Sequence, residues 1–456
     1  MTDFKQPKKV LAYLNTVVDY IYPKDGVNEE LMEKFHHEIP RAKKNPEMEV
    51  PRSDDTTPML QSELNTSVKG ALSDMFNGQA NAQELIFGRA SRKAAGGSLG
   101  NTMAPLLGSS VDGMPVIDGK ILTNLPETED AEISTESYPD GAVLDYVRQG
   151  ECLTVHVVPY HDGRSQFPTL HDGNPSNTNM SPYLFKELKD GFYDEFFIEG
   201  FTAAGPHFEH EAQTILTAIT SANMIRERLG KEPMKLVITA GAQFICENPA
   251  YRKFVEDVTK VTPVRIHANT GEFRRLLDND EDWRKEAQKG FTGLKGRALE
   301  AAKKASKEYR AAKTQANLDT IQKAMSTWGM ATKHALEFVV TDGGNDGYVV
   351  NNDNYLVVTP EPLDPSTIVN KVGAGDAFMA GYTLAVELGL DQEQAMKAGG
   401  VFARHVLQQE DARPVMPSRP NSMYGYGGAA GLLALHGLVA PSAGAQAQRF
   451  SPEAFG

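Results

Sequence analysis

Val372-Gly373-Ala374-Gly375-Asp376-Ala377-Phe378 is the segment that says most about the fold. It contains a glycine turn and a carboxylate, and an apolar run follows them, which predicts a helix buried on most of its sides. The first turn of such a helix has main-chain N–H groups without intrahelical acceptors, and these can hold a phosphate. Asp376 would then lie where it can take a proton from an attacking hydroxyl. The stretch predicts a phosphoryl-transfer centre, whereas an isolated glycine turn predicts no more than the start of a core helix.

Further motifs follow predicted strands elsewhere in the chain. The strands are residues 10–14, 264–268 and 338–341, and the segments after them contain Asp19, residues 269–272 and residues 342–347. A second glycine turn, residues 95–102, would let a ligand approach the backbone closely. In an open parallel sheet the carboxyl ends of the strands face one crevice, where ligands bind. These segments therefore predict a single site.

Apolar strands alternate with helical stretches along the chain, as in a doubly wound parallel sheet. Two further strands are predicted at residues 196–198 and 236–238. After the apolar helix, Gly389 suits a helix end, and Asp391 with Gln394 predicts a capping box that opens the next helix. The pattern predicts the α/β class.

Two regions differ in composition from the rest. Residues 281–336 are rich in Ala, Lys, Glu and Gln and predict a helical insertion, whose lysines form either a solvated face or a partner-binding surface. Residues 421–456 are rich in Gly and Ala and predict a C-terminal tail with a short helix near Leu432.

In this order, the motifs resemble those of the ribokinase-like (PfkB) family of sugar and nucleoside kinases. The resemblance runs from about Leu11 to about Pro417. Within the family, the sequence is most similar to the inosine-guanosine kinase branch. The motifs that carry it are Ala95-Gly96-Gly97-Ser98-Leu99-Gly100-Asn101-Thr102-Met103, Ile238-Thr239-Ala240-Gly241-Ala242-Gln243-Phe244 with Glu247-Asn248-Pro249, and Val369-Asn370-Lys371-Val372-Gly373-Ala374-Gly375-Asp376. The four ordered motifs of the family match this sequence at residues 96–101, 269–272, 341–347 and 370–376, and together they are far more specific than any one of them.

The resemblance implies a ribokinase-like three-layer α/β/α sandwich with a mostly parallel, doubly wound central sheet and a small β-rich lid. It places the kinase domain at residues 8–420 and the lid at about 19–51 and 104–170. A closing lid would exclude water as a competing phosphoryl acceptor. The alternative is a peripheral sheet with no gating role.

The resemblance also implies roles for the matching residues. Asp376 would be the catalytic base, and the amides of Gly373, Ala374 and Gly375 the anion hole. The residues implied for substrate hydroxyls are Asp19, Gly96, Gly97 and Asn101; those beside the donor ATP are Thr341, Gly343, Gly344, Gly347 and Lys371. Asn269 and Glu272 would organise Mg²⁺, mainly through water, because this ion keeps several waters when bound.

Three features depart from the family pattern, and one of them is the glycine loop at 341–347, which is one residue longer than usual and leaves either Gly343 or Gly344 as the matching glycine. Asn370-Lys371 stands where most members have Asp-Thr, and Lys371 is either a phosphate contact or a solvated side chain. The glycine common in the first strand is replaced by Ala12 or its neighbours, which weakens the substrate assignment more than the catalytic one.

The composition is that of a chain able to bury a large core, with 456 residues, 40% hydrophobic and 23% charged. The formal net charge of -14 argues against general binding to nucleic acid or to an anionic membrane. No apolar run reaches the length of a membrane span, no signal-peptide core follows Met1, and Cys152 and Cys246 provide no disulfide framework. We expect a cytoplasmic enzyme with small-molecule partners, and a homo-oligomer remains open.

The leading hypothesis is a phosphotransferase that moves the γ-phosphoryl of ATP, with Mg²⁺, to the 5′-hydroxyl of a purine nucleoside such as inosine or guanosine. The alternatives are a kinase of a free sugar or another nucleoside, and a silent member of the fold that binds a nucleoside or nucleotide. The sequence lacks the G-x-x-x-x-G-K-[ST] and H-R-D motifs, which disfavours P-loop kinases and protein kinases.

Overall fold

A nine-stranded sheet forms the centre of the molecule. The computed structural model describes residues 6–22, 58–59, 92–135, 138–148, 153–159, 165–166, 169–170, 179–205, 207–241, 243–277, 307–329, 334–352, 354–409 and 426–440. In spatial order the strands are β17 (Tyr355–Val358), β16 (Gly347–Asn351), β15 (Leu336–Thr341), β14 (Val264–Asn269), β13 (Lys235–Thr239), β12 (Glu195–Glu199), β1 (Lys8–Tyr13), β7 (Ile117–Leu125) and β8 (Val143–Arg148). The pairs from β15 to β8 are parallel, and β16 and β17 are antiparallel.

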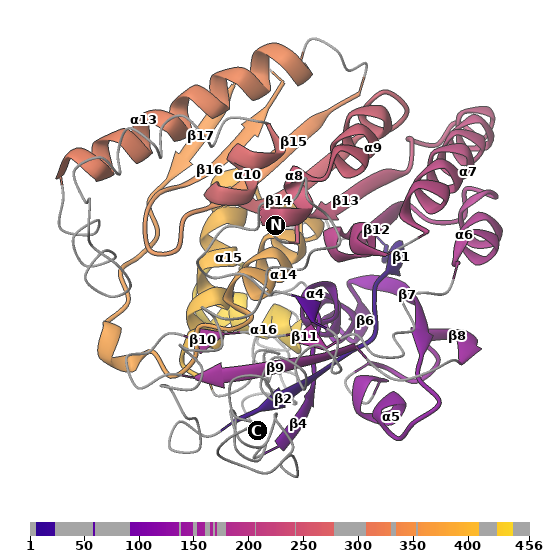
Figure 1. The fold of residues 1–456 in the computed structure, drawn as a ribbon, viewed down its shortest axis with the longest axis horizontal. Coiled ribbons are helices and arrows are strands. Elements are labelled where there is room, and N and C mark those ends of the chain that lie inside the picture. The colour runs from indigo at the N-terminus through magenta and orange to yellow at the C-terminus, as the bar shows by residue number, and fades with distance from the viewer. Residues whose placement is uncertain are drawn as a thin grey trace, which may run out of the picture.

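Helices cover both faces of this sheet, as Figure 1 shows. One face carries α4 (Ser98–Leu107), α14 (Ala374–Glu387), α15 (Gln392–Leu407) and α16 (Ala429–Leu435). The other carries α6 (Ser181–Leu188), α7 (Phe208–Arg228), α8 (Gln243–Glu247), α9 (Pro249–Thr259), α10 (Thr270–Leu276) and α13 (Lys307–Lys323), with α13 continued by a π-helical turn at Ala324–Gly329. The predicted three-layer α/β/α sandwich is confirmed.

Two hydrophobic cores result from the two-residue alternation of the central strands. In β12, Phe196 and Ile198 face the α7 side, while Phe197 faces the α14 side. All three are buried, because a parallel sheet with helices on both faces leaves neither face to water. The predicted strands at 10–14, 196–198, 236–238, 264–268 and 338–341 all lie in this sheet.

A smaller sheet lies beside α4, at the lower edge of the view in Figure 1. Its strands are β3 (Pro58–Met59), β11 (Thr169–Leu170), β9 (Leu153–Pro159), β2 (Val17–Ile21) and β4 (Arg92–Ala95), with β10 (Ser165–Gln166) paired to β9. The short helix α5 (Asp130–Thr135) packs against β2 and β4. A third sheet of two-residue strands joins β18 (Tyr426–Gly427), β5 (Ser110–Val111) and β6 (Met114–Pro115).

The third sheet contains β5 and β6 of the predicted lid segment 104–170, so the strands of this segment are divided among all three sheets. Its strands β7 and β8 belong to the central sheet, because β7 pairs in parallel with β1, and only the later strands join the smaller sheet. The lid segment 19–51 lies outside the described residues beyond Tyr22. The lid boundaries stay a prediction.

The insertion and the tail also differ from simple appendages. Residues 278–306 lie outside the described part, and the rest of the insertion packs through α13, which buries Ile321 in the core below it. In the predicted tail, α16 buries Leu432 and Leu433 against the α14 side of the sheet. The predicted short helix is therefore an integral part of the core.

Candidate active site

The first turn of α14 is open to solvent. Gly373 precedes it with φ 77°, in the left-handed region that favours glycine, and as the N-cap residue it has no side chain with which to cap the helix. The amides of Ala374 and Gly375 stand in the first turn, where a helix provides no carbonyl acceptor. A Cβ added to Gly375 would meet nothing within 4 Å. This turn can receive an anion from solvent.

Asp376 is oriented by two side chains of α4. Ser98 Oγ donates to Asp376 Oδ1 over 2.6 Å, and Asn101 Nδ2 donates to Oδ2 over 3.1 Å. Thr102 Oγ1 bonds the main-chain carbonyl of Asp376 over 3.1 Å, which ties the two helices together. Each carboxylate oxygen has two lone pairs, so the carboxylate can still accept a proton from a ligand.

Glu199, at the end of β12, is a second carboxylate in the same region. It is 2% exposed, and its oxygens accept from the main-chain N–H of Asn15 at 2.6 Å and of Leu99 at 3.4 Å. Burial raises the pKa of the Glu199 carboxyl to about 7; the nearby charge of Asp376 adds to the rise, and the two N–H bonds oppose it. Glu199 thus joins the end of β1 to the start of α4.

Asp19 and Gly96 lie in direct contact. A Cβ at Gly96 would come within 2.1 Å of Asp19 Oδ1, so only glycine leaves room for this carboxylate. Gly96 also donates its N–H to Val17 O over 3.0 Å, and Gly97 begins α4 with φ 84°. The predicted substrate residues Asp19, Gly96, Gly97 and Asn101 therefore lie in one group with Asp376.

Asn269 and Glu272 form the capping box of α10. The Asn269 side chain accepts from the N–H groups of Gly271 and Glu272, and the Glu272 carboxylate accepts from Asn269 N over 2.9 Å. In the described part of the chain, no group of three or more His, Cys, Asp or Glu residues could hold a metal ion. One carboxylate and one amide fit Mg²⁺ only through water and substrate phosphates.

The predicted donor loop follows β15, next to α10. Thr341 is paired with Asn269 across the two strands. Gly343 has φ 60° and Gly344 does not have a positive φ, so the turn requires glycine at Gly343. Gly347 opens β16, where a Cβ would come within 2.6 Å of Met396 Cε. Gly347 is therefore explained by packing against α15.

Asp342 connects this loop to the insertion. Its Oδ1 accepts from Thr270 Oγ1 at 2.9 Å and from Lys313 Nζ at 2.5 Å. Lys313 of α13 is therefore paired, and it departs from the expectation of a wholly solvated lysine face. Lys371, in contrast, is exposed just before α14.

The site residues thus fall into two groups at the carboxyl edge of the sheet. The first group contains Asp376 and the predicted substrate residues. The second group contains the predicted metal and donor residues at the ends of β14 and β15. In the sheet, β13 separates β14 from β12. Sequence reasoning missed Ser98, Asn15 and Glu199. Glu199 directly follows the predicted strand 196–198, and a carboxylate in that place was the available signal.

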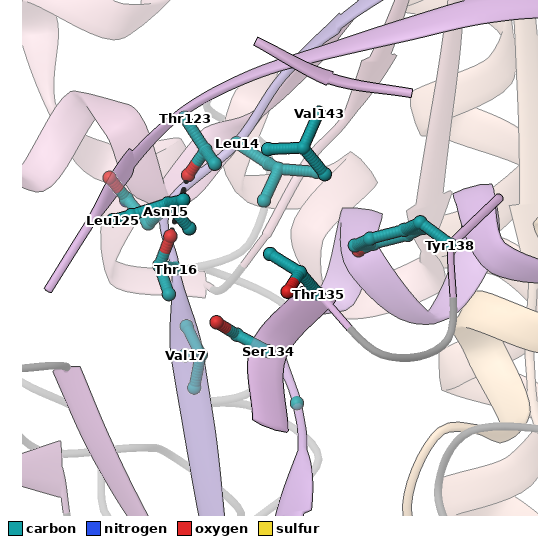
Figure 2. Close-up of a pocket in the computed structure, with 11 residues that line it drawn as sticks. Leu14, Asn15, Thr16, Val17, Thr123, Leu125, Ser134, Thr135, Tyr138 and Val143 are labelled. Carbon is teal, nitrogen blue, oxygen red and sulfur yellow. Dashed lines mark hydrogen bonds between the residues drawn. The ribbon is translucent and has the colours of Figure 1, made fainter. Parts of the chain in front are cut away.

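A cleft lies next to the first group, between the two larger sheets (Figure 2). Asn15 and Gly96 line it where it meets the group around Asp376. Figure 2 shows Thr16 and Thr123 on one side and Ser134, Thr135 and Tyr138 on the other. The cleft borders the candidate substrate site at Gly96.

No helix among the described residues has both the length and the apolarity that crossing a membrane requires.

Comparisons with known proteins give one family match and a set of solved structures with a similar fold. Residues 304–419, about a quarter of the chain, match the model of the pfkB family of carbohydrate kinases. This range contains the predicted donor loop and Asp376. No curated protein sequence matches the chain.

Solved structures of kinases share the fold. A probable sugar kinase protein from Rhizobium etli CFN 42 is 16% identical with a TM-score of 0.58, over 95% of this chain and 100% of that one. Adenosine kinase from Sinorhizobium meliloti is 17% identical with a TM-score of 0.54, over 90% and 96%. Adenosine kinase from Schistosoma mansoni in complex with 2-fluoroadenosine is 12% identical with a TM-score of 0.56, over 88% and 96%. The chain thus has the ribokinase-like α/β fold of these sugar and adenosine kinases, and its pfkB family match contains the α14 motif.

Proposed function

We propose that the protein transfers the γ-phosphoryl of ATP to the 5′-hydroxyl of a purine nucleoside, with inosine or guanosine as the leading acceptors. The observation that carries this proposal is the place of Asp376 on the uncapped first turn of α14, between the donors Ser98 and Asn101. The pfkB match over residues 304–419 and the fold shared with sugar and adenosine kinases support it.

In the proposed reaction, Asp376 takes the proton of the acceptor hydroxyl as its oxygen attacks the γ-phosphorus. Ser98 and Asn101 hold the carboxylate in place, which matters because a base must lie within hydrogen-bond reach of the proton it removes. The amides of Gly373, Ala374 and Gly375 bind the oxygens of the transferred group. Such donors are already oriented by the helix, so they need little reorganisation during the reaction.

The remaining predicted residues would position the two substrates. Asp19, Gly96 and Asn101 would bind the acceptor hydroxyls, and the loop at Thr341 and Gly343 would lie beside the donor nucleotide. Mg²⁺, when bound with ATP, neutralises phosphate charge. Asn269 and Glu272 would organise its water ligands, because this ion keeps several waters when it is bound.

The alternatives differ in the acceptor and in the chemistry. A sugar kinase would use the same Asp376 and first helical turn, but it would need no room for a base beyond the sugar site. A silent binding protein would not need the carboxylate that α4 orients, so the Ser98 and Asn101 bonds favour catalysis.

The test is a phosphoryl-transfer assay with ATP and Mg²⁺ against a panel of purine nucleosides, pyrimidine nucleosides and free sugars. We expect a 5′-monophosphate from guanosine or inosine, identified by mass spectrometry, and formation on the order of a thousandfold slower with the Asp376→Asn variant. Turnover of sugars alone would assign the alternative substrate class. Nucleoside binding without turnover of any acceptor would overturn the kinase proposal.

A further inference from the structure

Helix α13, which belongs to the predicted insertion, turns one face toward the rest of the protein. Its buried residues recur at three- and four-residue spacing, as on a single helix face, and include Ala316, Asn317, Thr320 and Ile321. Lys313 lies on the same face, one turn before Asn317, and its side chain is 27% exposed. The helix packs against α10 (Figure 1). The face that contains Lys313 is therefore an internal contact surface.

Lys313 neutralises a carboxylate at the start of the predicted donor loop. Its Nζ bonds Asp342 Oδ1 at 2.5 Å, and the Asp342 side chain is 14% exposed. Thr270 Oγ1 donates to the same oxygen over 2.9 Å, and Asn345 Nδ2 donates to Oδ2 over 3.2 Å. Donors from α10, from α13 and from the loop itself thus meet on one carboxylate. Among these three donors, only Lys313 carries a charge.

Asp342 lies between the two segments that the proposed function assigns to the donor. It directly follows Thr341, the last residue of β15, which is in register with Asn269 at the end of β14. Thr270, its partner on α10, directly follows Asn269. A nucleoside triphosphate brings several negative charges to this edge of the sheet. A partly buried carboxylate without a paired cation would repel them.

A second bond ties α13 to α10. Asn317 Oδ1 accepts from Arg274 Nη1, and the two residues are 3% and 2% exposed. Asn317 lies one turn after Lys313, so two successive turns of α13 hold the donor loop and α10 at once. The capping box of Asn269 and Glu272 forms the start of that same α10. The insertion is therefore built onto both segments of the predicted donor site.

We infer that α13 is part of the donor site and that Lys313 is a positioning residue for the nucleoside triphosphate. It acts through Asp342, whose negative charge it cancels and whose side chain it holds against Thr270, and it need not touch the nucleotide. The inference rests on the proposed function for the place of the donor. It adds to that site a helix and a cation that belong to none of the four sequence motifs.

The first test is the Lys313→Met variant. With Asp342 no longer neutralised, we expect the KM for ATP to rise about tenfold, while kcat and the KM of the acceptor stay within about threefold of wild type. Lys313→Arg keeps the charge and should keep the KM for ATP. Lys307→Met, the same change at an exposed lysine of α13, is the matched control and should behave as wild type. An unchanged KM for ATP in Lys313→Met would overturn the inference and leave the kinase proposal standing.

The Asp342→Asn background shows whether Lys313 acts through Asp342. This variant keeps an acceptor for Thr270 and removes the negative charge, so its KM for ATP should not rise. Adding Lys313→Met to it should then change the KM for ATP by less than about threefold, because no uncompensated carboxylate remains. The comparison holds even where Lys313→Met alone fails to fold. A tenfold rise in the double variant would overturn the positioning role.

Direct binding separates the two proposals if no acceptor is phosphorylated. Calorimetric titration of the intact protein with ATP and Mg²⁺ then compares wild type, Lys313→Met and Lys307→Met. Binding that is about tenfold weaker in Lys313→Met alone would support the inference although the kinase proposal had failed. Equal affinities in all three proteins would overturn the inference. A wild-type protein that neither binds ATP nor phosphorylates any acceptor would overturn both.

Discussion

The two ends of α14 lie in opposite environments. At its N-terminal end, Asp376 stands in an uncapped turn that is open to solvent beside Gly375. Farther along, Tyr382 is buried and donates to Glu337, which also pairs with Arg265 at 2.6 Å and accepts from Gln392 at 2.7 Å. One end leaves polar groups available to a ligand, and the other satisfies them with protein.

This difference shows how one helix can both stabilise the fold and present its first turn to a ligand. The buried part fixes the direction of α14, because Arg265 of β14 lies over the Tyr382 ring at 5.2 Å while bonding Glu337 of β15. A helix held in this way can leave its first turn uncapped, and there its amides remain available. We therefore expect changes at the two ends to affect different measurements.

The largest expected effect is at the open end. Asp376→Asn removes the base but keeps the size of the side chain, so we expect kcat/KM to fall by about 10³-fold, within the range for loss of a general base. Nucleoside affinity and Tm should change little. Steady-state kinetics, calorimetric binding and thermal unfolding measure the three quantities; activity within threefold of wild type would refute the role of Asp376.

The second effect is at the closed end. Arg265→Leu removes the guanidinium that pairs directly with the Glu337 carboxylate, so we expect the free energy of unfolding to fall by about 3 kcal/mol, as for a broken buried ion pair. The double variant Arg265→Leu with Glu337→Leu should recover most of this loss. Urea denaturation gives the stabilities.

The turnover number kcat of the Arg265→Leu variant provides the control for that stability prediction. Below its unfolding temperature, Arg265→Leu should keep kcat within about threefold of wild type, because Tyr382 lies more than one helical turn from Asp376. A hundredfold loss of kcat in a fully folded variant would mean that the two ends are not separable.

Much of this comparison could be predicted from the sequence. The apolar run after Asp376 predicted a buried helix, and the strand motifs predicted a parallel sheet with one ligand-binding edge, because both depend on local periodicity. The capping box at Asp391 and Gln394 is confirmed for the same reason. Sequence neighbours alone determine such features.

The rest depends on contacts between distant segments. Glu199 meets the amides of Asn15 and Leu99 only because β12 pairs with β1. Likewise, the sequence of β7 predicts a strand but does not say to which sheet the strand belongs. Its pairing with β1 places it in the central sheet. Sequence reasoning also assigned Gly347 to the nucleotide, whereas its contact with Met396 gives a packing reason.

Glu199 gives the third prediction, which concerns pH at the open end. Its folded-state pKa, raised by burial to about 7, lies above the ordinary 4.5, so the folded protein keeps a proton that the unfolded chain loses. Stability should therefore fall as pH rises from about 4.5 to 7, by roughly 2 to 3 kcal/mol. The facing charge is Asp376, and the opposing N–H bonds come from Asn15 and Leu99.

The Glu199→Gln variant isolates this contribution because it cannot ionise. Urea denaturation at pH 5, 6, 7 and 8 should give a flatter dependence of unfolding free energy on pH than in wild type. Parallel curves for wild type and Glu199→Gln would show that Glu199 does not titrate in this range.

The smallest expected effect separates main-chain from side-chain recognition at the open end. Lys371 is exposed before α14, and the first turn already offers amides at Ala374 and Gly375. If these amides bind the transferred phosphoryl group, Lys371→Met should change kcat/KM less than threefold, since an exposed cation is screened by water and salt. Measuring kcat/KM of wild type and variant at about 50 mM and about 300 mM salt sharpens the test, because added salt screens the charge of an exposed side chain. A loss of thirtyfold or more that shrinks at high salt would instead make Lys371 a phosphate contact, and recognition at this end of α14 would then depend on a side chain as well as on the helix.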